Sequence, residues 1–292
     1  MREEKNIVRK FYEEYGWEKA SSDAYQDTAA FVDMRPVMGA YQERCMRRLG
    51  AHFAGGGRWF LDAGCGAIAS PGYAALSDGH THRVCVDFSG AALRAARGTL
   101  GEGALCVQAD ITRLPFRDNA FDAVLCAHVL YHVPADEQSE AMGELQRVLA
   151  PQGSGVVVYT WPDAWMNRVA VRFNPRVVAP KIPGLRWAWR AFLKRKPRAD
   201  APMAETAPPG TPPHPPLYFH PHPWAWFRDA VLPDVPFKLR CWQSAGVPFT
   251  QAFIPNHRIG RAMLRVLSIA EKVFPGLMAR IGTYPMFVLR KK

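Results

Sequence analysis

The sequence predicts an α/β fold built on a mostly parallel β-sheet with helices on both faces. Between residues 58 and 160, short apolar runs typical of strands alternate with amphipathic stretches typical of helices, and the links between them are short. A glycine turn, Gly64-Cys65-Gly66, directly follows the first of these strands. Open parallel sheets bind their ligands at the carboxyl ends of the strands, so this turn is the expected place for a site.

The length of the chain indicates the size of the fold, and its cysteines indicate the cellular compartment. A chain of 292 residues forms one large domain, or a core with an elaborate insert. Its six cysteines form no Cys-x-x-Cys pair, and several lie in apolar runs, which favours a reducing compartment. The N-terminus is too polar for a signal peptide, and no apolar run is long enough to span a membrane. We therefore expect a cytoplasmic protein.

The alternating part of the chain defines the core, and amphipathic stretches precede it. Residues 3–17 and 37–53 have the pattern of amphipathic helices, and they belong to a helical cap over residues 1–57. The core spans residues 58–160. Its expected strands are 59–63, 83–87, 104–109, 121–127 and 155–160, and its expected helices are 72–77, 89–100 and 134–149. Such repeats imply right-handed crossovers in a parallel sheet.

The alternation stops after residue 160. Residues 161–236 are basic and rich in proline, with an extended stretch at 197–216, and we expect them to form an inserted lid. A helix is expected at 224–231. In the remaining segment, 237–292, the pattern predicts strands at 237–242 and 284–290 around a helix at 258–274, with Pro275 as its stop signal.

Three carboxylates follow the strands of the core. Asp62 precedes the glycine turn, Asp87 ends the second strand about twenty residues later, and Asp110 ends the third. A carboxylate at the second strand suits the two hydroxyls of a ribose. One at the third strand, followed by apolar Ile111, suits an adenine, and Asp62 suits a cationic group. Together they indicate a ligand with adenine, ribose and positive charge but no phosphate.

Five segments in order resemble the signatures of class I S-adenosylmethionine-dependent methyltransferases, in the small-molecule branch similar to the quinone-biosynthesis enzymes. They are residues 61–66, 86–89, 108–116, 121–124 and 147–154. The resemblance implies a doubly wound, mostly parallel seven-stranded sheet with an antiparallel last strand, and S-adenosylmethionine as cofactor. The cofactor-binding residues that it implies are Asp62, Ala63, Gly64, Gly66, Asp87, Phe88, Asp110, Ile111 and Ala127.

The sequence departs from that pattern after Gly66. Pro71 and Gly72 disfavour a helix interior, so the helix after the turn is expected to start late. Arg35 is a candidate from outside the core for holding the methionine carboxylate of the cofactor.

Two groups of histidines invite a chemical role. His128 and His132 follow the fourth strand, and either could act as a general base for the methyl acceptor or could brace the loop through hydrogen bonds. His128 is the preferred base, because it is nearer the end of the strand. His214, His220 and His222 lack the companion ligands and spacing of a zinc site, so we expect no metal and assign residues 218–224 to a lid over the acceptor pocket.

The positive charge lies in one half of the chain. The first 160 residues contain 16 Lys and Arg against 20 Asp and Glu, whereas the rest contain 21 against 6. Residues 185–196 have the pattern of a helix that lies on an anionic membrane, and Arg258, Arg261, Arg265 and Lys272 form a second basic stripe. A solvated basic face, a peripheral membrane contact and an anionic acceptor are all consistent with this pattern.

Alternative functions fit the residues less well. In a nicotinamide dehydrogenase, Asp62 would face a pyrophosphate, and Asp110 would have no role. Residues 126–129 lack the motifs of base-methylating enzymes, which does not favour a nucleic-acid acceptor. The sequence therefore favours methyl transfer to an O, N or C nucleophile of a small metabolite or lipid-like acceptor. The alternatives are a non-catalytic S-adenosylmethionine-binding regulator and an RNA methyltransferase.

Overall fold

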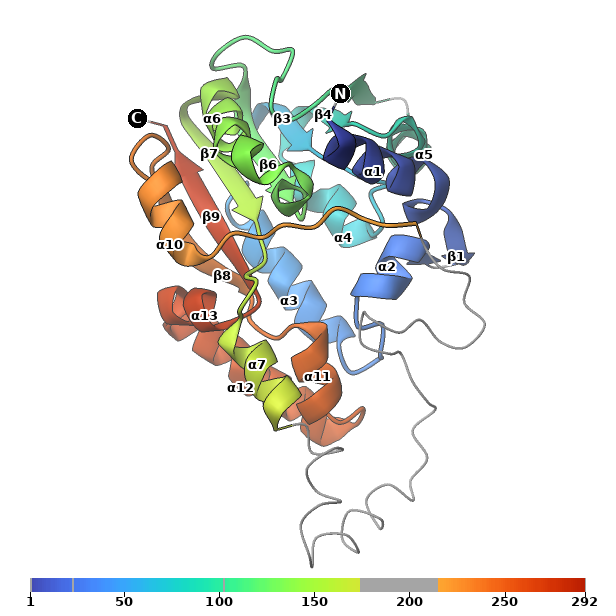
Figure 1. The fold of residues 1–292 in the computed structure, drawn as a ribbon, viewed down its shortest axis with the longest axis vertical. Coiled ribbons are helices and arrows are strands. Elements are labelled where there is room, and N and C mark those ends of the chain that lie inside the picture. Colours follow the sequence, from blue (N-terminus) through green and yellow to red (C-terminus); the bar gives the residue numbers. More distant parts are fainter. Residues whose placement is uncertain (1, 23, 102, 174–214, 292) are drawn as a thin grey trace, which may run out of the picture.

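The computed structural model describes residues 2–22, 24–101, 103–173 and 215–291. Its main feature is a seven-stranded sheet in the order β5-β4-β3-β6-β7-β9-β8 (Figure 1). Strands β3 to β7 are parallel to one another, and β9 is antiparallel to both β7 and β8. The strands are β3 (Gly57–Ala63), β4 (His80–Asp87), β5 (Ala104–Gln108), β6 (Phe121–Ala127), β7 (Leu149–Val158), β8 (Phe237–Gln243) and β9 (Tyr284–Arg290). The predicted fold class is confirmed.

The strand order reverses between β3 and β6. From β3 the chain moves outward through β4 to β5, and it then returns to place β6 on the other side of β3. The connecting helices include α5 (Gly90–Leu100) and α6 (Gln138–Val148). A parallel sheet opens a crevice where its order reverses, so the end of β3 is where a ligand is expected.

Several elements were not predicted. They are the hairpin β1 (Lys19–Ser21) and β2 (Ala24–Tyr25) and the helices α2 (Gln26–Phe31), α7 (Trp165–Arg172), α11 (Val247–Phe253) and α13 (Pro275–Ile281). Pro275 ends one helix as predicted, but it also begins the next, because proline suits the first turn of a helix. The predictions for residues 185–196, His214 and most of 197–216 lie outside the described residues.

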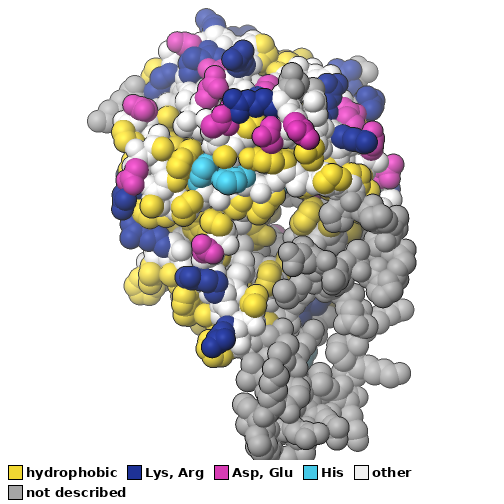
Figure 2. Space-filling model, in the orientation of Figure 1, with side chains coloured by type: hydrophobic (Ala, Val, Ile, Leu, Met, Phe, Trp, Pro, Cys, Tyr) yellow, Lys and Arg dark blue, Asp and Glu magenta, His cyan; other side chains and the backbone are white. Residues whose placement is uncertain are grey.

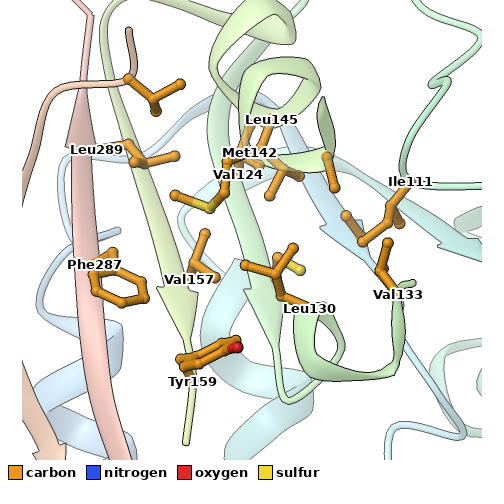
Figure 3. Close-up of a cluster of buried hydrophobic side chains, with 14 of the residues drawn as sticks. Ile111, Val124, Leu130, Val133, Met142, Leu145, Val157, Tyr159, Phe287 and Leu289 are labelled. Atoms are coloured by element: carbon orange, nitrogen blue, oxygen red, sulfur yellow. The ribbon is translucent and has the colours of Figure 1, made fainter. Parts of the chain in front are cut away.

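The core lies between the sheet and α6. Met142 and Leu145 of α6 pack against Val124 of β6 and Val157 of β7, and Phe287 of β9 continues the same layer (Figure 3). All five side chains are fully buried. Because β3, β6 and β7 are covered on both faces, they read as continuous apolar runs, which is why the sequence identified them.

A second layer closes the β8 edge of the sheet. It is formed by α3 (Gly39–Gly50), α12 (Arg258–Val273) and α13. Glu271 of α12 is fully buried and accepts hydrogen bonds from Tyr41 Oη (2.5 Å), Ser244 Oγ (2.6 Å) and Arg48 Nη2 (2.9 Å). One carboxylate therefore joins α12 to α3 and to the loop after β8. No helix in the described ranges is both long and apolar enough to cross a bilayer.

Replacing this carboxylate should destabilise the fold. Glu271→Ala leaves several buried donors without an acceptor, and we expect a loss of about 2–3 kcal/mol in the free energy of unfolding. Urea denaturation measures the loss. Glu43→Ala is the control, because Glu43 pairs with Arg47 on an exposed helix surface and should change stability by less than about 0.5 kcal/mol. Equal losses in the two variants would contradict the prediction.

Candidate functional site

The glycine turn begins directly after β3. Gly64 has a φ of 75° and Gly66 a φ of 57°, both in the region that favours glycine. A Cβ at Gly64 would lie 2.3 Å from Val129 Cγ2, and one at Gly66 would lie 2.7 Å from the Trp17 ring. The backbone N–H groups of Gly64 and Cys65 donate to the Val86 carbonyl at 2.7 and 3.0 Å, so the turn is fastened to β4. Both glycines are therefore required by conformation and by space.

Asp87 lies beside this turn, as predicted. Its Oδ2 accepts from the Gly66 N–H at 2.9 Å, and its Oδ1 accepts from the Ser89 N–H at 2.9 Å. Burial raises the pKa of Asp87 to about 6, although its backbone hydrogen bonds act in the opposite direction. No ion pair to Asp87 occurs within the described ranges. The end of β4 thus holds a desolvated carboxylate without a countercharge.

Asp110 and Ile111 follow β5. The Asp110 carboxylate accepts from the Thr112 N–H (2.9 Å) and pairs with Lys5 Nζ (2.7 Å). Burial acts to raise the pKa of Asp110, but the Lys5 hydrogen bond and other contacts outweigh it, so the pKa is lowered. Ile111 is 6% exposed and joins the main core. Asp110 and Ile111 thus follow β5, and the ion pair of Asp110 with Lys5 of the N-terminal helix was not predicted.

Asp62 is paired within the protein. Its side chain is fully buried, and it forms an ion pair with Arg83 Nη2 (2.5 Å) and accepts from Tyr73 Oη (3.1 Å). Burial acts to lower the pKa of Arg83, but the neighbouring Asp62 charge outweighs it and raises the pKa. Arg83 thus already supplies a countercharge to Asp62, and the contact of Asp62 with a cationic ligand group stays a prediction.

After the glycine turn the next helix starts late, as Pro71 and Gly72 predicted. The helix α4 (Pro71–Ala74) starts late, and the Ser70 side chain caps it by accepting from the Tyr73 N–H at 3.2 Å. A surface recess of about 610 Å³ lies beside it. Residues from the end of the turn, from α4 and from the β1–β2 hairpin line it, among them Ile68, Ser70, Lys19 and Tyr25.

Arg35 is engaged elsewhere. Its guanidinium pairs with Asp33 (2.6 Å) and donates to the Ile254 carbonyl (2.8 Å), next to α11. These contacts do not support Arg35 as the group that holds a ligand carboxylate.

The two candidate histidines lie together after β6. Ala127 ends that strand, and His128 follows with a φ of 64°, a conformation that non-glycine residues adopt rarely. His128 Nδ1 lies 3.1 Å from Tyr131 Oη, and His132 Nδ1 lies 2.7 Å from the Tyr218 carbonyl. Burial is the main cause that lowers the pKa of each histidine to about 4, so both are neutral near pH 7. Since a carbonyl can only accept, His132 carries its proton on Nδ1, and its Nε2 is able to accept.

The described part of the predicted lid packs against His132 and Tyr131. The His220 N–H donates to the Tyr131 carbonyl at 2.8 Å, and Gln138 Nε2 donates to the His220 carbonyl at 2.8 Å. The Phe219 ring contacts the rings of Tyr131 and His132. His222 stacks on Trp226 with centroids 3.9 Å apart. Figure 1 shows this segment crossing the molecule toward α10 (Trp224–Trp226).

The N-terminal segment supplies site residues that sequence reasoning missed. Tyr12 Oη lies 3.5 Å from His132 Nε2 and 3.4 Å from Asp27 Oδ1. Burial raises the pKa of Asp27 to about 6. The Tyr12 ring stacks on Trp17, whose buried Nε1 has no hydrogen-bond partner among the described residues. Glu13 accepts from the Gly90 N–H (2.5 Å) at the start of α5. The cluster of aromatic residues between positions 11 and 17 is the sequence feature that could have indicated these site residues.

Comparison with known proteins identifies the core. Residues 61–157 match the sequence profile of a family described as "Methyltransferase domain". This part of the chain is similar to methyltransferase domains. The match contains the glycine turn, Asp87, Asp110 and both candidate histidines, and it confirms the predicted class I methyltransferase resemblance. The family uses S-adenosylmethionine, as predicted.

Curated relatives match the same region. The chain is 33% identical over 113 residues to the "Probable tRNA methyltransferase 9B" of Mus musculus, which covers 38% of this chain and 24% of the relative. It is 34% identical over 129 residues to the "Demethylmenaquinone methyltransferase" of Clavibacter sepedonicus, covering 43% of this chain and 51% of the relative. The chain thus spans between a quarter and half of the length of these relatives.

Solved structures with similar folds include two that differ in their described activity. One is the N-methyltransferase NodS of Bradyrhizobium japonicum WM9 in complex with S-adenosylhomocysteine, with a TM-score of 0.40, 20% identity, and coverage of 49% of this chain and 69% of that chain. The other is the [4+2]-cyclase SpnF, with a TM-score of 0.47, 17% identity, and coverage of 95% and 86%.

The relatives bear on the predicted partners of the methyltransferase domain. A relative in quinone biosynthesis agrees with the predicted branch. However, we expected no nucleic-acid acceptor, and a relative named as a probable tRNA methyltransferase conflicts with this expectation. The RNA alternative therefore stays open, and the roles of the individual site residues stay predictions.

Proposed function

We propose that this protein transfers the methyl group of S-adenosylmethionine to an O, N or C nucleophile of a small metabolite or lipid-like acceptor. The observation that supports this proposal most is the contact between Asp87 and the glycine turn. A carboxylate without a countercharge lies at the end of β4, within hydrogen-bond distance of the Gly66 N–H, where the strand order reverses. This is a suitable site for hydroxyl donors of a ribose.

The residues of the site fit such a cofactor. The two glycines let the Val129 side chain and the Trp17 ring approach the backbone of the turn closely, and the Trp17 indole N–H there is a buried donor without a partner among the described residues. We assign Asp87 to the ribose hydroxyls, and Asp110 with Ile111 to the adenine. Ala63, Phe88 and Ala127 would line the site. Asp62, by contrast, is assigned to hold the base of the turn through Arg83, because its carboxylate is already paired.

The cofactor, when bound, supplies a methyl group on a positively charged sulfur. The chain's own residues then have to orient the acceptor and receive its proton, and orientation contributes most to such a transfer. His132 Nε2 is unprotonated and lies 3.5 Å from Tyr12 Oη, and we propose that this nitrogen accepts the proton. Tyr12, whose hydroxyl lies between His132 Nε2 and Asp27 Oδ1, would hold the His132 ring in place.

We also propose that the predicted lid, residues 161–236, encloses the acceptor, alongside the helical cap (residues 1–57) and the core (residues 58–160). The final segment, residues 237–292, would complete the sheet. The contacts of Tyr218 and His220 with the loop after β6 support an enclosing position for the lid. A cytoplasmic location and a membrane contact of the basic half are separate proposals that do not involve the site.

An RNA acceptor is the second candidate, because two curated relatives at 32–33% identity are named probable tRNA methyltransferases. The test is to incubate the full chain with S-adenosylmethionine and either a panel of small phenols, amines and quinols or unmodified tRNA, and to measure S-adenosylhomocysteine. Formation with a small acceptor supports the proposal, and formation with tRNA alone selects the second candidate. Tight cofactor binding with no turnover on any acceptor would leave the non-catalytic regulator.

Cofactor binding should depend on pH through Asp87. The ribose hydroxyls donate to an ionised carboxylate, and the pKa of Asp87 is raised to about 6. The affinity for S-adenosylhomocysteine should therefore be constant above this pH and fall by up to about tenfold per pH unit below it. Calorimetric titration between pH 5 and 8 measures this.

Two variants assign the effect to one carboxylate. Asp87→Asn should give an affinity that no longer changes with pH, whereas Asp27→Asn, which removes the other carboxyl with a pKa near 6, should keep the dependence. Loss of the dependence in Asp27→Asn alone would contradict the assignment.

A further inference from the structure

Helix α12 has an apolar face that the rest of the described structure leaves exposed. This face consists of Ile259 (62% exposed), Met263 (40%), Val266 (67%), Ile269 (62%) and Val273 (59%). With 3.6 residues per turn, these five side chains lie within an arc of about 120° along the whole helix. Two further large apolar side chains, Phe274 (58%) and Leu277 (57%), are exposed beyond the end of α12.

A row of cations lies along one side of the apolar row. Arg258, Arg261, Arg265 and Lys272 are all exposed and project from the adjoining arc of α12. The only acidic residue between positions 258 and 281 is Glu271, which is fully buried against α3 and paired with Arg48. The exposed surface of these two helices is therefore apolar and positively charged.

The opposite side of α12 is the packed one. Gly260, Leu264, Ser268 and Glu271 are buried, and Arg44 of α3 donates to Ser268 Oγ at 3.0 Å. The orientation of the helix is thus fixed by its contacts with α3, and its aliphatic row is held outward. Figure 1 places α12 and α13 at one end of the molecule, with α7 near them in this view, and Figure 2 shows hydrophobic and basic side chains next to one another at that end.

From this arrangement we infer that the α12–α13 face is a docking surface for an anionic lipid bilayer. A helix lying in a membrane interface buries an apolar face among acyl chains and places cations against the headgroups. The α12 rows have this form, and their charge is complementary to an anionic leaflet. A contiguous exposed row of large aliphatic side chains is otherwise unusual on a soluble surface.

Other occupants fit this face less well. RNA would pair with the arginines, but its phosphates and sugars offer no partner for Ile259, Val266 and Ile269. A second copy of the chain would bring the same exposed cations toward each other without an exposed acid on the face to compensate. Docking on a bilayer through this face does not depend on the proposed methyl transfer.

Vesicle co-sedimentation of the full chain, without cofactor, tests the inference. One set of vesicles is phosphatidylcholine alone, and the other is an equal mixture of phosphatidylcholine and phosphatidylglycerol. The chain should sediment with the mixed vesicles and remain in solution with the neutral ones. The double variants Val266→Gln/Ile269→Gln and Arg261→Gln/Arg265→Gln should each bind the mixed vesicles roughly tenfold or more weakly.

Matched controls use exposed residues away from this face. Leu105→Gln changes an aliphatic side chain that is 45% exposed on β5, at the opposite edge of the sheet, and Arg113→Gln/Arg117→Gln removes two cations beyond that strand. Both controls should bind like the unchanged chain, and circular dichroism should show every variant folded.

Equal recovery with both vesicle types, or an unchanged affinity in the two α12 variants, would overturn the inference. Binding to tRNA that both α12 variants abolish, without vesicle binding, would reassign the face to RNA. A concentration-dependent dimer that Val266→Gln/Ile269→Gln dissociates, again without vesicle binding, would reassign it to a second copy.

Discussion

Asp87→Ala is expected to weaken the binding of S-adenosylhomocysteine on the order of 100-fold. The variant removes the charged acceptor for the ribose hydroxyls, and a hydrogen bond to a charged group contributes about 1.5–3 kcal/mol, which is roughly 10- to 150-fold in affinity. It also removes the acceptor for the Gly66 N–H, so part of the turn loses its connection to β4. Isothermal titration calorimetry of the variant and of the unchanged chain measures the difference.

Asp122→Ala separates loss of the ligand contact from loss of structure. Asp122 also accepts two backbone hydrogen bonds, from the Arg58 N–H (2.8 Å) and the Trp59 N–H (2.9 Å), but at the opposite end of β3. This control should lower stability while leaving the affinity of the folded protein nearly unchanged. If both variants lose affinity to the same extent, Asp87 has no specific role in binding.

Gly64→Ala is expected to destabilise the fold by about 3–5 kcal/mol and to abolish cofactor binding. Alanine at a φ of 75° carries a strain of about 1 kcal/mol or more, and its Cβ would lie 2.3 Å from Val129 Cγ2, which forces the loop after β6 to move. Because His128 lies in the same loop, the displacement would reach the acceptor side of the site. Urea denaturation gives the stability, and calorimetry gives the binding.

Gly98→Ala is the matched control for this substitution. Gly98 lies within α5, and a Cβ there would meet nothing within 4 Å. Alanine at an open helical position should leave stability unchanged or raise it by about 0.5–1 kcal/mol. A Gly64→Ala variant as stable as Gly98→Ala would show that the turn tolerates a side chain, and the requirement for glycine at position 64 would then be wrong.

The sheet was predictable from the sequence because its strands are continuous apolar runs. Phe121–Ala127 and Tyr284–Arg290 were predicted with the bounds that the structure shows. Gly64 and Gly66 follow one strand and Asp87 ends the next. Because the ends of neighbouring parallel strands meet at one edge of a sheet, the sequence predicted that these residues lie together. These features depend on residues close in sequence or on a regular topology.

Long-range contacts were not predictable in the same way. Asp62 looked like a ligand contact because its position before the turn is visible in the sequence, whereas its partner Arg83 is on another strand, 21 residues away. Tyr12 and Asp27 reach His132 from the N-terminal segment through contacts that no local pattern encodes. For α12, the basic stripe was visible in the sequence, but which face α3 would bury was not.

Titration of the unchanged protein with S-adenosylhomocysteine, and separately with NAD, tests the central claim most directly. The site is proposed to bind a phosphate-free adenosyl ligand through Asp87 and the glycine turn. We therefore expect one molecule of S-adenosylhomocysteine to bind per chain and NAD not to bind. Absence of S-adenosylhomocysteine binding, or binding of NAD at the same site, would contradict this claim.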